Sequence, residues 1–375
     1  MDLKTKQTVV RQLAKQYKKA RKIQKGELLT ELTRLVGYNR SYARFVLRKP
    51  PVSRKKQHRK RPFKYLVILG ILKKLWYLSN FSTGKRLVPL IPILLDSLGR
   101  HNELKVKAWE KKLLLRISPA TCNRLLKGER RKLGIKVKSG TKPGSLLKTQ
   151  IPIHTWFDWD DTKVGFLEID TVHHNGGNPS GEYIHTLDTT DVATGWNECA
   201  ALMGRGETGL VKALTAIRQK LPFPLLGIDF DSGGEFVNWH LVRYCKRNKI
   251  TYTRAREGYS NDQPYIEQQN YPVVRTFVGY KRLDTEKQLG LLNQLYLKLS
   301  DYQNFFQSVM RLKEKVRNGA HVTRRYSKAK TAYQRSLESP DISDKVKEKL
   351  KTRFLNLNPR RLLLEINALA RKVNS

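Results

Sequence analysis

The chain has 375 residues and a formal net charge of +42, because 74 Lys and Arg side chains oppose 32 Asp and Glu. The length predicts two or three domains, and a hydrophobic content of 39% excludes a wholly disordered chain. No apolar run reaches the roughly 18 residues of a membrane-spanning helix, and the N-terminus lacks the apolar core of a signal peptide. The three Cys form no disulfide framework. We therefore expect a cytoplasmic protein without a membrane partner.

The positive charge is concentrated in the two flanks of the chain. Residues 1–150 contain 40 basic and 7 acidic side chains, residues 151–280 contain 12 and 16, and residues 281–375 contain 22 and 9. Lys and Arg near phosphates release condensed counterions, which strengthens the binding of nucleic acids. We therefore expect the flanks to bind a nucleic acid.

The N-terminal segment predicts a first helix-turn-helix. Residues 27–35 form an amphipathic helix, residues 36–38 form a turn, and Asn39 can cap a helix that continues to about residue 48. The apolar face of that second helix consists of Ala43, Val46 and Leu47. Its basic face, predicted to contact DNA bases or phosphates, consists of Arg40, Arg44 and Arg48. A helical bundle with a solvated Arg face is the alternative interpretation.

A basic linker and a second helical region follow. The run SRKKQHRKRPFK at 53–64 follows Pro50 and Pro51 and contains Pro62, and it is predicted to be a linker that can become ordered on DNA. Ser118 is predicted as the N-cap, and Pro119 as the first residue, of another candidate recognition helix, with Leu125 and Leu126 facing inward. The outward residues of this helix, predicted to contact DNA, are Thr121, Arg124 and Lys127.

From residue 164 the hydrophobic period changes from helical to strand-like. The expected elements are a strand from about 164, two strands within 182–202 joined through 191–195, a helix at 207–220, a strand ending at Asp231, a helix from about Glu235, a strand ending at Ala255 and a long helix from about Asp262. This order predicts a mixed α/β sheet of five strands with helices, of the ribonuclease H-like kind, although the order alone is compatible with several folds.

Three acidic residues of this region are placed where they can form a metal site. Asp170 lies on the first expected strand, Asp231 ends the fourth, and Glu267 lies early in the last helix, with 60 and 35 residues between them. If the first and fourth strands are neighbours, the two Asp lie side by side, and clustered carboxylates are tolerated mainly when a cation neutralises them. Two Mg²⁺ or Mn²⁺ ions on the three carboxylates would support a phosphoryl displacement. For any one of these acids, a capping or surface role is the alternative. The auxiliary candidates are His174, Glu235, Asn261 and Asn270.

A sequence motif surrounds each of the three acids: EID contains Asp170, DSGGEF contains Asp231, and NDQPYIEQQN contains Glu267. Together the motifs resemble those of integrase-type transposases of bacterial insertion sequences, which share the Asp-Asp-Glu core of retroviral integrases. The resemblance covers about residues 110–340, and Ser232 stands where the family usually has Asn. It implies metal-dependent cutting at element ends, strand transfer into a target DNA, and a homo-oligomer of at least two copies on DNA.

The histidines lead to two further expectations. His174 follows the first acid by four residues, where members of the family carry His or a similar residue. It either contacts a scissile phosphate or packs against the following turn. Zinc is not predicted, because neither His58 nor His101 has a Cys pair near it, unlike the zinc-binding start of retroviral integrases.

Beyond residue 300 the chain is again basic, and we expect it to be mainly helical. The run RRYSKAK at 324–330 is interpreted as a segment that follows phosphates, or alternatively as solvated surface. The predicted organisation is a helix-turn-helix at 1–50, a basic linker at 51–64, a second helical DNA-binding region at 65–137, a linker at 138–163, the integrase-type catalytic core at 164–280 and a basic C-terminal region at 281–375.

These patterns and the resemblance predict a DNA transposase. It would bind insertion-sequence ends and target DNA, and would catalyse metal-dependent strand cleavage and strand transfer. A catalytically silent DNA-binding protein descended from a transposase is one alternative. A ribonuclease H-like nuclease that cuts without joining is the other.

Overall fold

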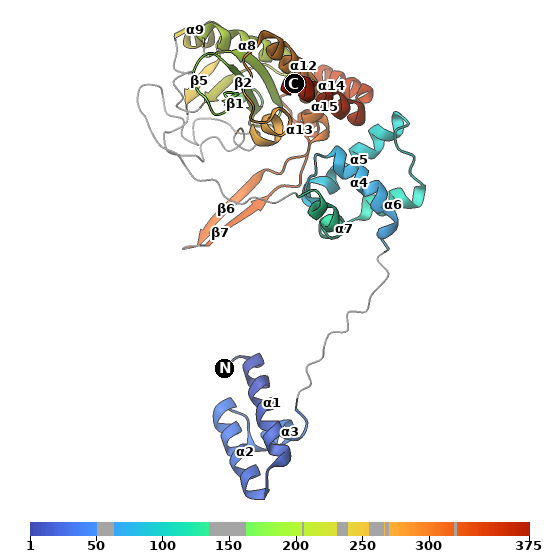
Figure 1. Ribbon diagram of the computed structural model, residues 1–375, viewed down its shortest axis with the longest axis vertical. Helices are drawn as coiled ribbons and strands as arrows, with labels where there is room; N and C mark the ends of the chain where they lie inside the picture. The colour runs from blue at the N-terminus through green and yellow to red at the C-terminus, as the bar shows by residue number, and fades with distance from the viewer. Residues whose placement is uncertain are drawn as a thin grey trace. The chain divides into compact units, whose positions relative to one another are not determined.

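The computed structural model describes residues 1–50, 64–134, 163–204, 206–230, 239–254, 266, 270–318 and 321–375 (Figure 1). The chain divides into two compact units, Met1–Phe63 and Lys64–Ser375. None of the described helices is long and apolar enough to cross a membrane.

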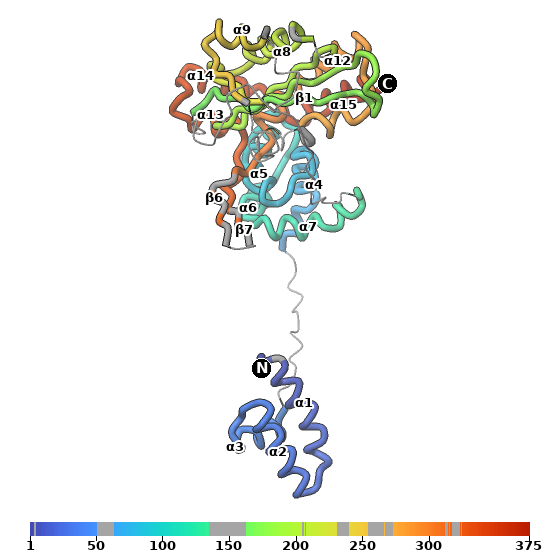
Figure 2. The backbone as a smooth tube through the Cα atoms, turned by 90° about the vertical axis from the view of Figure 1, so that its left-hand side faces the viewer, coloured from blue at the N-terminus to red at the C-terminus, as the bar shows by residue number. Residues whose placement is uncertain are grey.

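The first unit is a bundle of three helices with its own core (Figure 2). Its helices are α1 (Leu3–Lys19), α2 (Lys22–Val36) and α3 (Arg40–Arg48). Gly37 ends α2 in the left-handed conformation at φ 74°, which glycine adopts without steric cost. Asn39 then caps α3, because its side chain accepts a hydrogen bond from the backbone N–H of Tyr42 at 2.7 Å. The turn and the second helix thus lie where the sequence predicts them.

Four helices open the second unit. They are α4 (Leu69–Leu78, after a 3-10 turn at Leu66–Ile68), α5 (Gly84–Arg100), α6 (Ala108–Arg116) and α7 (Pro119–Lys132). Ser118 caps α7 and Pro119 is its first residue, as the sequence predicts. The buried side chains of these helices and those of the strands form one continuous hydrophobic cluster. The region predicted at 65–137 therefore belongs to the same compact unit as the strands.

The mixed five-stranded sheet is confirmed. Its strands are β1 (Phe166–His173), β2 (Ile184–Asp191), β3 (Asn197–Met203), β4 (Gly227–Phe230) and β5 (Thr251–Arg254), in the order β3-β2-β1-β4-β5. The first three strands form an antiparallel meander, whereas β4 is parallel to both β1 and β5. Helix α8 (Glu207–Lys220) packs on β2 and β3 and has the bounds predicted from the sequence, and α9 (Trp239–Arg247) packs on α8.

The C-terminal part contains helices and one hairpin. Its elements are η2 (Asn270–Arg275), α11 (Thr276–Val278), α12 (Glu286–Phe306), β6 (Leu312–Asn318), β7 (His321–Tyr326), α13 (Ala332–Glu338), α14 (Asp344–Asn356) and α15 (Pro359–Asn374). Figure 1 shows α12, α14 and α15 gathered beside the sheet and the β6–β7 hairpin extending away from it. The expectation of a mainly helical region is wrong for 312–326, where the two strands pair antiparallel.

Candidate active site and DNA-binding helices

Asp170 lies in the middle of the central strand of the sheet. It is half-buried on β1, and its Oδ1 accepts a hydrogen bond from the backbone N–H of Thr171 at 2.7 Å. Strand β4 lies beside β1, and the parallel register pairs Ile169 of β1 with Phe230, the last residue of β4. Asp231 is the next residue in the chain and lies outside the described residues. The residues that precede the two predicted ligands are therefore cross-strand neighbours.

The chain beside the third predicted ligand is also attached to β1. Glu267 lies outside the described residues, but Ile266 before it is fully buried. The backbone N–H of Ile266 donates a hydrogen bond of 2.8 Å to Oε2 of Glu168, which is buried two positions before Asp170. Glu168 thus holds the residue before Glu267 against the strand that carries Asp170.

One carboxyl group beside Asp170 was not predicted from the sequence. Asp188 lies directly opposite it on β2 and is fully buried. Burial raises the pKa of Asp188 to about 7, and the negative charge of Asp170 acts in the same direction. Oδ1 of Asp188 accepts hydrogen bonds from Nδ2 of Asn197 at 2.6 Å and from Sγ of Cys199 at 3.4 Å, which oppose this shift. The antiparallel register needed to find this neighbour cannot be read from the sequence.

His174 lies in the interior rather than on the surface. Its Nε2 is 2.8 Å from Oγ1 of Thr186, which in turn is 2.6 Å from the hydroxyl of Tyr296. Burial lowers the pKa of His174 to about 3, and the nearby positive charge of Arg275 contributes in the same direction. The imidazole is therefore neutral near pH 7 and has no solvent-exposed surface.

The remaining auxiliary candidates are not brought together by the described residues. Glu235 and Asn261 lie outside them, and Asn270 begins η2, with only its backbone described. Within the described part of the chain, no group of three His, Cys, Asp or Glu residues could hold a metal ion. Asp231 and Glu267, two of the three predicted ligands, lie outside that part of the chain.

Helix α3 carries all three predicted Arg side chains on its exposed face. Ala43, Val46 and Leu47 are buried against the other two helices, as predicted. Nη1 of Arg40 donates a hydrogen bond of 3.0 Å to Oγ1 of Thr30 on α2.

Two aromatic residues of the same helix are also exposed and were missed in the sequence. The side chains of Tyr42 and Phe45 are 47% and 56% exposed, and their rings are stacked at 6.3 Å. The two residues are three positions apart, which places them on the same side of a helix. This spacing, on the basic side of α3, could have identified them in the sequence.

Helix α7 requires one correction. Thr121 was predicted to face outward, but it is buried, and its hydroxyl accepts hydrogen bonds from Ser118 at 2.9 Å and Arg124 at 3.1 Å. The hydroxyl is thus used in the N-terminal cap of the helix rather than offered to DNA. Arg124 and Lys127 are exposed.

Comparisons with known proteins give a relative in sequence and distantly similar solved structures. No protein-family model matches the chain. The chain is 36% identical over 339 residues to the uncharacterized protein y4rM of Sinorhizobium fredii, which covers 87% of this chain and 93% of that protein. The catalytic core domain of BIV integrase is similar at 15% identity and a TM-score of 0.31, over 47% of this chain and 95% of that chain. The catalytic core domain of HTLV-2 integrase, solved with magnesium in a dimeric form, has 14% identity and a TM-score of 0.29, over 38% of this chain and 88% of that chain.

Proposed function

This chain belongs to the family of the y4rM protein of Sinorhizobium fredii, and we propose that it is a DNA transposase with a ribonuclease H-like catalytic core. The observation that carries the proposal is the attachment of two further chain segments to β1, the strand that carries Asp170. Ile169 pairs with Phe230, and Ile266 is bonded to Glu168. Each of the three predicted catalytic acids is the next residue after one of these positions, so a common site for all three is supported.

The donor set fits a divalent metal site. Asp170, Asp231 and Glu267 offer carboxylate oxygens, which are the ligands that Mg²⁺ and Mn²⁺ prefer. Burial raises the pKa of Asp188 beside Asp170, and the negative charge of Asp170 acts in the same direction. When bound, two such ions would activate the attacking hydroxyl and stabilise the leaving oxygen of a phosphodiester.

The other residues of the site support the three acids. Glu168 is a positioning residue, because its carboxylate holds the backbone of Ile266. In its protonated form, Asp188 adds no negative charge to the site beside Asp170. His174 is held in the interior by its contact with Thr186 on β2.

The basic flanks would bind the DNA. Arg40, Arg44 and Arg48 on α3 would contact the element end, and Arg124 and Lys127 on α7 would contact DNA further along. We further propose that the protein acts in the cytoplasm as an assembly of at least two copies.

A strand-transfer assay tests the function. The full chain is incubated with Mg²⁺ or Mn²⁺, labelled DNA from the sequences that flank the gene, and a plasmid target. A transposase gives both cleaved and joined products, a nuclease gives only cleaved ones, and a silent DNA-binding protein gives neither.

Substitutions assign the chemistry. Asp170→Asn, Asp231→Asn and Glu267→Gln should each abolish cleavage while end binding is retained. The matched control is Glu286→Gln, which removes an exposed carboxylate from the first turn of α12 and should cleave like the wild type. Retained cleavage in one of the three variants would remove that residue from the catalytic set.

A further inference from the structure

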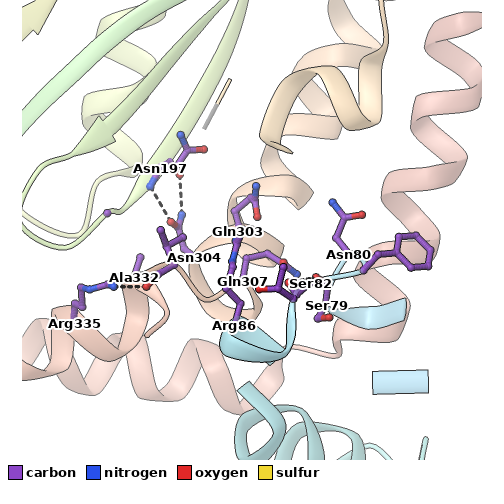
Figure 3. Close-up of a pocket in the computed structure, with 14 residues that line it drawn as sticks. Ser79, Asn80, Ser82, Arg86, Asn197, Gln303, Asn304, Gln307, Ala332 and Arg335 are labelled. Atoms are coloured by element: carbon purple, nitrogen blue, oxygen red, sulfur yellow. Dashed lines mark hydrogen bonds between the residues drawn. The ribbon is translucent and has the colours of Figure 1, made fainter. Parts of the chain in front are cut away.

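A polar cavity of about 190 Å³ lies within the second compact unit. Its walls come from the 79–83 segment between α4 and α5, the start of α5, the β2–β3 turn at Gly195, the C-terminal end of α12 and the start of α13. Figure 3 shows Arg86, Ser82 and Gln307 close together on one side, and Asn197 with Asn304 on another.

The lining of this cavity is positively charged. Arg86 and Arg335 contribute two guanidinium groups, and none of the described residues that line the cavity carries a carboxylate. Nη2 of Arg335 donates to the carbonyl oxygen of Val309 at 2.6 Å, so this guanidinium is fixed in place. The remaining polar lining consists of amides and hydroxyls, which can donate hydrogen bonds to an anion.

Arg86 is the lining residue whose charge and hydrogen-bond donors are best suited to bind a ligand. Its Nε donates to the carbonyl oxygen of Ser308 at 2.6 Å, which fixes the direction of the side chain. Its two terminal nitrogens have no hydrogen-bond or ion-pair partner among the described residues. Burial lowers the pKa of Arg86, and no neighbouring carboxylate offsets this effect. The side chain of Arg86 is half-buried, so an anion beside its terminal nitrogens would pair a charge that is partly removed from water.

The backbone next to Arg86 is held in an unusual conformation. Asn80 and Phe81 have positive φ angles of 50° and 57°, which are uncommon for residues other than Gly. Hydrogen bonds from Nε1 of Trp76 to the carbonyl of Ser82 at 3.0 Å, and from the Phe81 N–H to the carbonyl of Trp76 at 3.0 Å, maintain this conformation. Asn80 belongs to the lining of the cavity, and its side-chain amide has no hydrogen-bond partner among the described residues.

The start of α5 adds to the positive potential. Thr83 is the N-cap of this helix of 17 residues, but its side chain makes no capping hydrogen bond. The N-terminal end of a helix favours anions, and Arg86 belongs to its first turn. The guanidinium of Arg86 and the N-terminal end of α5 therefore both favour an anion in the cavity.

We propose that this cavity binds a phosphate group, with the terminal nitrogens of Arg86 as its main ligands and Asn80 as a second donor. Guanidinium groups bind the oxygens of phosphate in pairs, and the two guanidiniums of the lining favour such an anion. The phosphate can belong to a DNA backbone or to free inorganic phosphate. Neither case depends on strand cleavage, so the proposal is independent of the catalytic activity.

Calorimetric titration of the full chain with inorganic phosphate, at constant ionic strength, tests the site. Arg86→Gln should weaken phosphate binding by about tenfold or more, since hydrogen bonds to charged groups are lost. The matched control is Lys85→Gln, which removes an exposed charge one residue away and should bind like the wild type.

Asn80→Gly keeps the proposal testable if the Arg86 variant does not fold. Gly tolerates the positive φ of this position, so the fold should be retained while phosphate binding weakens. If Asn80→Gly and Arg86→Gln bind phosphate as tightly as the wild type, the proposal is wrong. It is also wrong if the wild type does not bind phosphate and Arg86→Gln binds DNA as the wild type does.

A competition experiment identifies the source of the phosphate. If saturating inorganic phosphate weakens DNA binding of the wild type to the level of Arg86→Gln, the natural ligand is a DNA phosphodiester. If phosphate binds and DNA binding is unchanged, the ligand is free phosphate. Both results support the site.

Discussion

The carboxylate of Glu168 joins two segments that are 98 residues apart in the sequence. Gln can still accept the hydrogen bond from the Ile266 N–H, whereas Ala leaves this buried donor unsatisfied, at a cost of about 1–3 kcal/mol. We predict that Glu168→Ala lowers the free energy of unfolding by about this amount and reduces DNA cleavage. Glu168→Gln should retain most of both. Urea unfolding and cleavage of end DNA measure the two effects.

Amide exchange provides the control for this positioning role. The Ile266 N–H should exchange faster in Glu168→Ala than in the wild type, and at nearly the wild-type rate in Glu168→Gln. If both variants lost cleavage equally with no change in exchange at Ile266, the charge of Glu168 would matter and not its hydrogen bond.

The burial of His174 predicts a pH dependence of stability. Its pKa is lowered from 6.5 to about 3 in the folded protein. Between these values the unfolded chain binds a proton that the folded protein does not, so stability is lost as the pH falls below 6.5. From about pH 7.5 to about pH 5 this residue should account for a loss of roughly 2 kcal/mol.

His174→Gln should remove this part of the loss. The measurement is urea unfolding of the wild type and the variant at the two pH values, with cleavage measured in parallel. The same pH dependence in both proteins would contradict the interior role. A loss of cleavage at unchanged stability would instead favour contact with the scissile phosphate.

Single residues could be predicted from the sequence when their signal is local. Asp170 belongs to an alternating strand pattern, and Ser118 and Asn39 are caps next to a hydrophobic period, so all three were placed correctly. The position of Asp188 opposite Asp170 depends on the register between two strands. The inward orientation of Thr121 depends on the direction of its hydroxyl, which can bond either the cap residue or solvent. Neither of these is encoded in local spacing.

Among the elements, the β6–β7 hairpin shows why a local signal can be overlooked. The strands contain a dense mixture of Lys, Arg and Glu, and these residues favour helices. However, β6 ends at Asn318 and is followed by Gly319, and an Asn-Gly pair is a strong hairpin signal. Here the turn residues, rather than the strand residues, carry the information.

Helix α3 allows a test of sequence recognition. The N-terminal end of a recognition helix enters the major groove, so Arg44 should reach a base edge and Arg48 a phosphate. A paired Arg–guanine contact discriminates by about 1–3 kcal/mol. Arg44→Ala should therefore reduce the preference for the element end over random DNA by roughly tenfold or more.

Arg48→Ala is the matched comparison on the same exposed face, and it should weaken binding to both DNAs together. A competition titration with scrambled ends distinguishes the two effects. Equal loss on both DNAs in Arg44→Ala would mean that α3 positions the protein without reading bases. In that case Arg124 on α7 becomes the next candidate.

At the scale of the whole molecule, the division into two units determines how DNA binding can be dissected. Residues 64–134 share a hydrophobic cluster with the sheet, for example through Leu98 and Leu126. A fragment that ends near residue 150 would cut through this cluster and expose its apolar side chains to water. The boundary at Phe63 avoids this, because Met1–Phe63 has a separate core that includes Leu32 and Val46.

We predict that the two units bind DNA in different ways when they are produced separately. Met1–Phe63 carries 20 basic and 3 acidic residues, so it should bind element-end DNA with an affinity that falls steeply as the salt concentration rises. Lys64–Ser375 carries 54 basic and 29 acidic residues, so it should still bind DNA but should lose most of the preference for the element end, because it lacks Arg44. Titrations of both units with end DNA and scrambled DNA at several salt concentrations measure this difference. A full preference for the element end in Lys64–Ser375, with none in Met1–Phe63, would move sequence recognition from α3 to the second unit.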